Sequence, residues 1–239
     1  MPPERLLRLT ASSAAKERRL QALLGERDPR DPRLLGLVED AQILGSLELS
    51  GFSVAWDEVR AARRGAPSPP EVEGLRCALA AVDPSAPLDA AALEAWRSAL
   101  RPAVPGYRRG VREREGAPPP APPEFIESRV AILAGWMGAD SSLELTPLQQ
   151  AAVALARIVE ILPFEDGNGR VSRLAASHLM ARGGPGPPIL VGGDGPRLRA
   201  CLRAAFRLEL EPLEALLEEA SERSIDVRIQ VLEAGEPWS

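Results

Sequence analysis

Residues 162–173 constrain the fold more than any other part of the chain, because they place a glycine-rich turn between two helical patterns. They read L-P-F-E-D-G-N-G-R-V-S-R. The pattern before the turn opens at Thr146, a favoured N-cap residue, and Pro147, which is tolerated in a first helical turn. Its apolar residues are spaced by three and four. The sequence therefore predicts a helix, a tight loop and a second helix.

Similar spacing runs through most of the chain, and no run of alternating β-branched residues interrupts it. Aromatic residues make up only 4 % of the sequence. We therefore expect an all-α protein. Besides the helix after the turn, helices are predicted over residues 3–26, 33–50, 53–64, 71–82, 88–100, 124–137, 146–161, 197–208 and 212–234.

Proline and glycine crowd residues 65–70, which is typical of a linker. This break predicts three parts, which are an N-terminal helical region over 1–66, a core domain over 71–205, and a C-terminal helix and tail over 206–239.

Composition narrows the classes of partner. The formal net charge of −5 over 239 residues argues against nucleic-acid binding. The sequence has no run of about 20 apolar residues and no signal-peptide pattern, so we expect no membrane segment and a cytoplasmic location. Lys16 is the only lysine, and with abundant alanine and proline this indicates a GC-rich bacterial genome.

The turn carries the chemistry of a phosphate-binding loop. Its glycines let successive backbone N–H groups face an anion, its aspartate is a hard oxygen ligand for a divalent cation, and its arginines can bridge phosphate oxygens. These residues are Asp166, Gly167, Asn168, Gly169, Arg170 and Arg173. The structural alternative is a tight turn between two helices with no ligand.

The stretch resembles the core motif of the Fic (Fido) family, H-P-F-x-D/E-G-N-G-R-x-x-R, whose best-known members transfer AMP from ATP to protein hydroxyls. Eleven of the twelve positions fit, and the exception is the first, where Leu162 replaces the catalytic histidine. The resemblance implies ATP and Mg²⁺ as ligands and a helical Fic core. It assigns Mg²⁺ to Asp166, the phosphates to Asn168, Gly169, Arg170 and Arg173, and structural roles to Pro163 and Phe164.

Leucine cannot accept a proton, so the family's general base is missing at position 162. General base catalysis is typically worth about 10² to 10⁴ in rate. The apolar spacing predicts that Leu162 continues the core-facing stripe of the preceding helix. Glu165 should face away from the site, and His178 reads as a structural histidine, so neither is expected to replace the base.

Two further segments resemble parts of Fic proteins. Gly106-Tyr107-Arg108 and the prolines up to position 123 suggest a flap with a short β-hairpin that would dock a target protein over residues 106–123. Residues 46–51, S-L-E-L-S-G, resemble an inhibitory helix, with Ser46 and Gly51 matching and Ser50 where a glutamate belongs. Without that glutamate, Arg173 should lack a resting partner.

We therefore expect a Fic-fold protein that keeps a Mg-nucleotide site, has impaired or absent AMP transfer, and works as a regulatory module. One alternative is an active adenylyltransferase, or another nucleotidyl or phosphoryl transferase, with a non-histidine base. Another is a non-catalytic interaction protein, antitoxin-like or homodimeric through its N-terminal helices.

Overall fold

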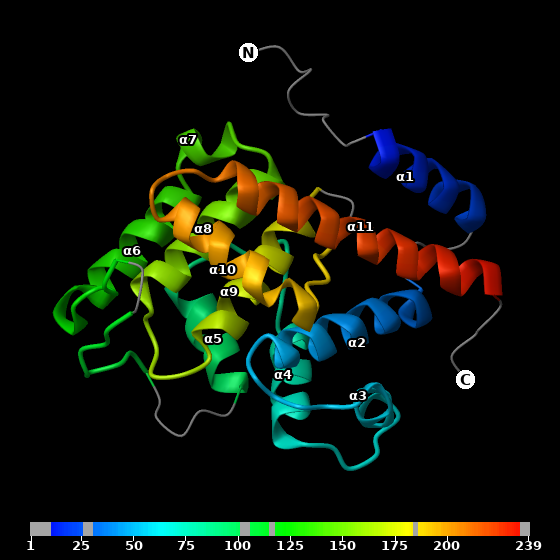
Figure 1. Cartoon of the computed structure of the whole chain (residues 1–239), viewed down its shortest axis with the longest axis horizontal. Helices are drawn as coiled ribbons and strands as arrows, with labels where there is room; N and C mark the ends of the chain where they lie inside the picture. Colours follow the sequence, from blue (N-terminus) through cyan, green and yellow to red (C-terminus); the bar gives the residue numbers. More distant parts are fainter. Residues whose placement is uncertain (1–10, 26–30, 101–105, 115–117, 184–185, 235–239) are drawn as a thin grey trace.

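A computed structural model describes residues 11–25, 31–100, 106–114, 118–183 and 186–234. The described residues form helices joined by turns and loops, which confirms the all-α prediction (Figure 1). The helices are α1 (Ala11–Leu24), α2 (Pro32–Glu48), α3 (Trp56–Arg63), α4 (Pro70–Ala80), α5 (Ala90–Ala99), α6 (Ile126–Met137), α7 (Asp140–Leu143), α8 (Pro147–Ile161), α9 (Asn168–Met180), α10 (Gly195–Ala205) and α11 (Glu211–Ala234). Short 3₁₀ turns precede α6, as η2 (Pro123–Phe125), and α10, as η3 (Gly192–Asp194).

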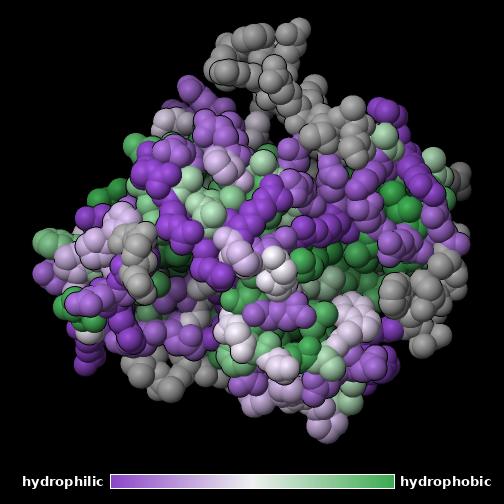
Figure 2. Space-filling view, in the orientation of Figure 1, coloured by the Kyte–Doolittle hydropathy of each residue, from purple (hydrophilic) through white to green (hydrophobic). Residues whose placement is uncertain are grey.

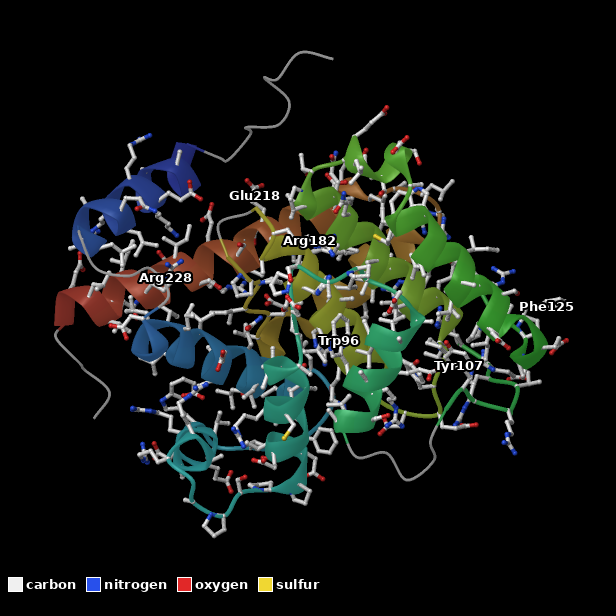
Figure 3. All side chains as sticks on the ribbon, turned by 180° about the vertical axis from the view of Figure 1, so that it is seen from behind. Trp96, Tyr107, Phe125, Arg182, Glu218 and Arg228 are labelled. Atoms are coloured by element: carbon white, nitrogen blue, oxygen red, sulfur yellow. The ribbon has the colours of Figure 1, made fainter. Side chains whose placement is uncertain are left out.

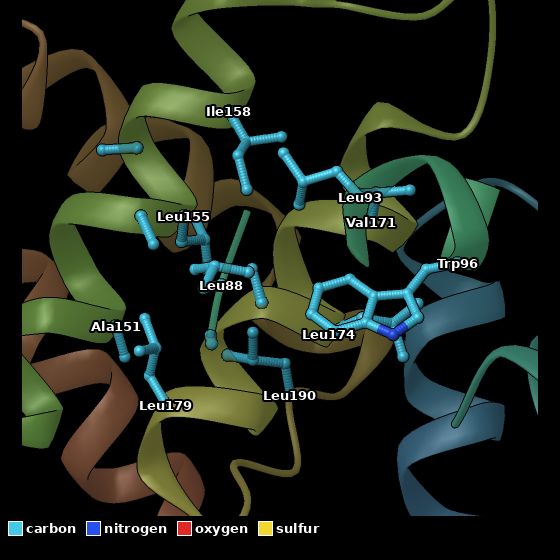
Figure 4. Close-up of a cluster of buried hydrophobic side chains, with 14 of the residues drawn as sticks. Leu88, Leu93, Trp96, Ala151, Leu155, Ile158, Val171, Leu174, Leu179 and Leu190 are labelled. Atoms are coloured by element: carbon cyan, nitrogen blue, oxygen red, sulfur yellow. The ribbon is translucent and has the colours of Figure 1, made fainter. Parts of the chain in front are cut away.

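The pair α8 and α9 forms the centre of the molecule, with other helices packed around it (Figure 1). Apolar residues on both helices are almost fully buried, and they gather in one large cluster with residues of α4, α5 and α6. Figure 4 shows part of this cluster, in which Trp96 of α5 lies among side chains that include Val171 and Leu174 of α9. Packing of this kind fixes both ends of the loop between α8 and α9.

Helix α2 belongs to the same core, since Ile43 and Leu47 are buried with it. A smaller cluster joins α1, the start of α2 and the second half of α11, and Leu20, Leu34 and Ile225 are among its members. In Figure 1, α1 and α2 both lie against the long α11.

One glycine allows a close approach that the core requires. A Cβ atom built on Gly45 of α2 would lie 1.9 Å from the carbonyl oxygen of Leu190. Real Cβ contacts are never that short, so only glycine lets the segment before η3 lie on α2 at this point.

The helices predicted from the sequence match the described helices apart from their ends, and α7 was not predicted. The first part of the predicted helix 3–26 lies outside the described residues. Residues 65–70 lead from α3 to α4, and side chains on both sides of them, such as Val59 and Val72, enter the same cluster. The domain limits placed there stay a prediction.

Helix α8 begins as predicted. Thr146 Oγ1 accepts a hydrogen bond from the backbone N–H of Gln149 (3.2 Å), and Gln149 Oε1 accepts one from the backbone N–H of Thr146 (3.1 Å). This reciprocal capping box fixes the start of the helix that leads into the motif.

The surface in the view of Figure 1 is mainly hydrophilic, with smaller hydrophobic areas between polar ones (Figure 2). Within the described ranges, no helix combines the length and the apolar character needed to cross a bilayer.

Candidate functional site

The loop between α8 and α9, residues 162–167, starts with an unusual backbone conformation. Helix α8 ends at Ile161, and Leu162 adopts a left-handed conformation with φ 52° and ψ 61°. The chain therefore turns away from the helical path, and Leu162 is half-buried and outside the core cluster. The prediction that Leu162 continues the core-facing stripe is wrong, because a helical register no longer applies beyond Ile161.

Arg108 holds this end of α8 in place. Its side chain is 2 % exposed and donates hydrogen bonds from Nε to the carbonyl of Leu162 (2.6 Å) and from Nη2 to the carbonyl of Ile161 (3.3 Å). It also donates to the carbonyls of Gly110 and Ala121. A cation at the C-terminus of a helix pairs with its unsatisfied carbonyls and with its dipole.

Asn168 shapes the loop rather than facing outward. Its Oδ1 accepts from the backbone N–H of Phe164 (2.9 Å), and its Nδ2 donates to the carbonyl of Phe164 (2.7 Å). Phe164 itself is 1 % exposed, with Tyr107 and Arg97 against its ring. The amide of Asn168 is thus used within the protein, and the expected phosphate contact is left to its backbone N–H.

The N-terminus of α9 presents the chemistry of an anion site. Gly167 precedes the helix at φ 80°, a conformation that favours glycine, and its carbonyl accepts the first hydrogen bond of the helix, from Val171. The N–H groups of the first helical turn have no partner within the helix and carry the positive end of its dipole. We call these N–H groups, of residues 168–170, together with the side chains of Asp166, Arg170 and Arg173, the anion site.

Asp166 and Arg170 face each other across the first turn. Arg170 Nη2 donates to Asp166 Oδ2 at 2.8 Å, and Asp166 Oδ1 accepts from the backbone N–H of Gly167 at 2.5 Å. The Arg170 side chain is 6 % exposed, with Phe52 against its guanidinium, whereas the Asp166 side chain is 75 % exposed. The carboxylate is therefore accessible to a cation in solvent.

Arg173 is held by the end of α2, against our expectation that it lacks a partner. Its Nε donates to Ser46 Oγ, and its Nη2 donates to the Ser46 carbonyl and to Ser50 Oγ, all at 2.8 Å. These acceptors are neutral, so they fix the guanidinium without cancelling its charge. Burial, and secondarily the charge of Arg170, lowers the pKa of Arg173 to about 9, which reflects a cation short of negative charge.

The end of α2 explains the other residues of the segment 46–51. The N–H of Gly51 donates to the Glu48 carbonyl and that of Phe52 to the Leu47 carbonyl, both at 3.0 Å, with Gly51 at φ 84°. This is a Schellman termination, and it accounts for Gly51 as a helix C-cap. Glu48 Oε2 accepts from the backbone N–H of Gly192 at 3.0 Å.

Arg97 of α5 is a residue at this site that sequence reasoning missed. It is 3 % exposed and lies beside Gly167, since a Cβ built there would be 3.4 Å from Arg97 Nε. The only sequence signal was a charged residue next to Trp96 in a helix that is otherwise largely apolar and alanine-rich.

Neither of the residues considered as a substitute base is suited to that role. Glu165 accepts from Arg112 Nη2 (2.5 Å) and from the Arg109 backbone N–H (3.3 Å), so it points to the segment before α6. His178 is 1 % exposed, lies near the far end of α9, and contacts Arg182 through Nε2 (2.9 Å). Burial and the charge of Arg182 lower its pKa to about 4.

The flap differs from the predicted hairpin. In the described residues of 106–123, the only β-type pairing is a bridge between Tyr107 and Phe164, and no strand forms. Proline and arginine dominate this segment, and it is tied instead to the loop and α8 by Arg108, Arg112 and Arg114. In Figure 3, the labelled Tyr107 and Phe125 lie towards the same end of the molecule.

Two hollows lie near the loop. A cavity of about 20 Å³ between α2 and α9 is lined by residues that include Ser46, Arg170 and Arg173, and it is large enough for one water molecule. A groove of about 720 Å³ between α6 and α8 is lined by residues that include Trp136 and Val153, and by neither arginine of the anion site.

Comparison with known proteins finds a family whose model covers this loop and its flanking helices. The model of the Fic/DOC family matches residues 87–180. A protein adenylyltransferase fic-1 of Caenorhabditis briggsae is 33 % identical over 106 residues, which cover 44 % of this chain and 21 % of that protein. A protein adenylyltransferase Fic of Culex quinquefasciatus is 31 % identical over 109 residues, which cover 46 % of this chain and 22 % of that protein.

The matched region therefore spans about a fifth of these relatives' length. They come from a nematode and an insect, and so give no support to the bacterial origin inferred from composition.

Solved structures show the same fold. A Fic domain-containing signalling protein from Bacteroides thetaiotaomicron superposes with a TM-score of 0.79 at 19 % identity, covering 96 % of this chain and 100 % of that one. Fic-1 from Caenorhabditis elegans gives a TM-score of 0.71 at 22 % identity, covering 94 % of this chain and 75 % of that one. Residues 87–180, which include the loop and its flanking helices, thus match the Fic/DOC family model, and the chain shares the fold of these Fic proteins.

Proposed function

We propose that this protein binds a Mg-nucleotide at the anion site and transfers AMP to protein hydroxyls very slowly or not at all, so that it works as a nucleotide-binding regulatory module. The observation that carries the proposal is the combination of a complete anion site with Leu162 at the position of the family's base.

The binding part rests on charge and on oriented N–H groups. The backbone N–H groups of Asn168, Gly169 and Arg170 would donate to phosphate oxygens, as helix N-termini do for many anions. Arg170 and Arg173 would add charge-assisted hydrogen bonds. Asp166 already fixes Arg170, and Ser46 and Ser50 already fix Arg173, so little side-chain freedom is lost when an anion binds.

The donor set also fits Mg²⁺, but only together with a nucleotide. Among the described side chains, no group of three or more His, Cys, Asp or Glu residues could hold a metal ion. Mg²⁺ commonly uses one or two carboxylates and completes its octahedron with phosphate oxygens and water. Asp166, with its exposed carboxylate, would be that ligand, and the bound cation would neutralise phosphate charge.

The catalytic deficit follows from the same loop. Leu162 offers no lone pair to accept the proton of an attacking hydroxyl, and Glu165 and His178 are engaged elsewhere. Transfer should therefore be slowed by the typical worth of a general base, about 10² to 10⁴. The left-handed backbone at position 162 suits a histidine, which tolerates this conformation better than leucine.

Residual transfer is the alternative favoured by the relatives, which are named protein adenylyltransferases. In that case a target protein would dock near residues 106–123, and the base would come from the target or from solvent. Mass spectrometry of cytosolic extract incubated with the protein and MgATP tests this, because an AMP or phosphate adduct that depends on Arg170 would support it. A cytoplasmic location and a homodimer remain proposals of the same kind.

Isothermal titration calorimetry tests the binding part. MgATP, ATP with EDTA, and Mg²⁺ alone are titrated into the wild type, Arg170→Met and the control Arg207→Met. Arg207 is exposed and pairs with Glu209, so its loss should change nothing at the anion site. Saturable MgATP binding that weakens at least about tenfold in Arg170→Met, with Mg²⁺ alone silent, supports the proposal. Absence of binding by MgATP and by ATP in the wild type refutes it and favours a purely structural Fic fold.

A further inference from the structure

Arg97 is a buried cation whose Nε atom lacks a hydrogen-bond partner among the described residues. It lies in the last turn of α5 and is 3 % exposed. Burial lowers the pKa of its guanidinium, and Arg170 lowers it further, while Asp166 raises it. A buried arginine without an acceptor is rare, since such groups are normally paired.

The guanidinium group lies at the anion site. A Cβ atom on Gly167 would be 3.4 Å from both Cδ and Nε of Arg97, and the Arg97 Cζ atom is 5.8 Å from the centroid of the Phe164 ring. Arg97 therefore lies beside the residue that precedes α9, where the N–H groups of the first turn point.

The fold holds Arg97 in this position. The preceding residue, Trp96, is 2 % exposed and packs in the core with Leu93 of the same helix and Leu174 of α9 (Figure 4). Because Leu100 after Arg97 is buried in the same core, α5 is anchored on both sides of the arginine, which therefore cannot move far into solvent. The folded protein therefore keeps the Arg97 guanidinium buried, although burial of this charge is unfavourable.

Resting on the proposed function, we infer that Arg97 is a third anion-binding arginine, which contacts the phosphate chain of the nucleotide from outside the motif. With three arginines, Arg97, Arg170 and Arg173, and one carboxylate, that of Asp166, the site carries an excess of positive charge. Such a site takes a polyanion with at least two phosphate groups in preference to a single phosphate. An anion would supply the acceptor that Nε of Arg97 lacks.

The test uses calorimetry and thermal melting together, with sodium tripolyphosphate, inorganic phosphate and MgATP as probes. The variants are Arg97→Met, which removes the charge and keeps the bulk, and Arg97→Lys, which keeps the charge and loses the planar fork. Arg129→Met on the exposed face of α6 is the control.

Two changes are expected in Arg97→Met. Tripolyphosphate and MgATP should bind at least about tenfold more weakly than to the wild type. The protein without ligand should melt at a higher temperature, because a buried unpaired cation is gone. Arg97→Lys should remain folded and bind with intermediate affinity, and Arg129→Met should match the wild type.

A purely structural arginine gives the opposite pattern. If Arg97→Met melts lower or does not fold, or if it binds both polyphosphates as the wild type does, the inference is overturned while the proposed function stands. If the wild type binds neither tripolyphosphate nor MgATP, both fail. Equal affinity of the wild type for phosphate and tripolyphosphate would also overturn the polyanion preference.

Discussion

Replacing Arg108 with alanine should destabilise the protein strongly, because this side chain satisfies four carbonyl groups from two segments of the chain. It donates to Ile161 and Leu162 at the end of α8, and to Gly110 and Ala121 in the segment before α6. No solvent-exposed arginine of that segment makes a comparable set of contacts among the described residues.

The magnitude can be worked from which carbonyls stay buried in Arg108→Ala. Gly110 is exposed, so water can replace the guanidinium there, whereas Ala121 and Ile161 are buried. Each buried acceptor left without a partner costs about 1–3 kcal/mol. Burial lowers the pKa of Arg108, which shows that burying this cation is unfavourable. Its removal therefore offsets part of the loss in the free energy of unfolding. We therefore expect a net loss of about 3 kcal/mol in the free energy of unfolding.

Urea unfolding monitored by circular dichroism measures this loss, with Arg109→Ala as the matched control. Arg109 is the next residue and its side chain is exposed, so the control should lie within about 0.5 kcal/mol of the wild type. A loss below about 1 kcal/mol in Arg108→Ala would refute the account of Arg108 as the clamp on the end of α8.

Three other variants test separate parts of the structure. Leu162→Asn should be about 1–2 kcal/mol more stable than Leu162→Val in urea unfolding, because asparagine tolerates the left-handed backbone and a β-branched residue does not. If Leu162→Val is the more stable variant, the left-handed conformation at position 162 is wrong. Burial lowers the folded pKa of His178 to about 4, below 6.5, so the unfolded chain takes up the proton first as the pH falls. Between pH 6.5 and pH 4, the free energy of unfolding of the wild type should fall by about 3 kcal/mol more than that of His178→Gln. If the unfolding free energies of the two proteins change in parallel with pH, the low pKa of His178 is wrong. Ser50→Glu should weaken MgATP binding at least about tenfold, because the glutamate would pair with Arg173, while Ser50→Gln should bind MgATP as the wild type does. Equal MgATP affinities of the two variants would contradict the claim that Arg173 needs neutral partners to stay available for an anion.

Local patterns were enough to predict the loop and the described helices other than α7. The N-cap at Thr146, the proline after it and the glycines of residues 167–169 each act through the nearby backbone, so a linear reading captures them. Helical spacing failed at Leu162 because the left-handed residue breaks the register in a way that periodicity does not encode.

Long-range contacts account for what the sequence did not predict. The hydrogen bonds of Arg173 to Ser46 and Ser50 join residues far apart in the chain, and the position of Arg97 beside Gly167 depends on how α5 packs on α9. The amide of Asn168 fits either a phosphate or a backbone group, and only the folded loop shows that Phe164 occupies it.

The most direct test of the account is a titration of ¹⁵N-labelled protein with MgATP followed by amide resonances. We predict saturable shifts centred on the N–H groups of Asn168, Gly169 and Arg170, with the Nε–H signals of Arg97 and Arg173 moving at the same ligand concentrations. Shifts confined to the groove between α6 and α8, or none at saturating MgATP, would contradict the claim that the N-terminus of α9 is a nucleotide phosphate site.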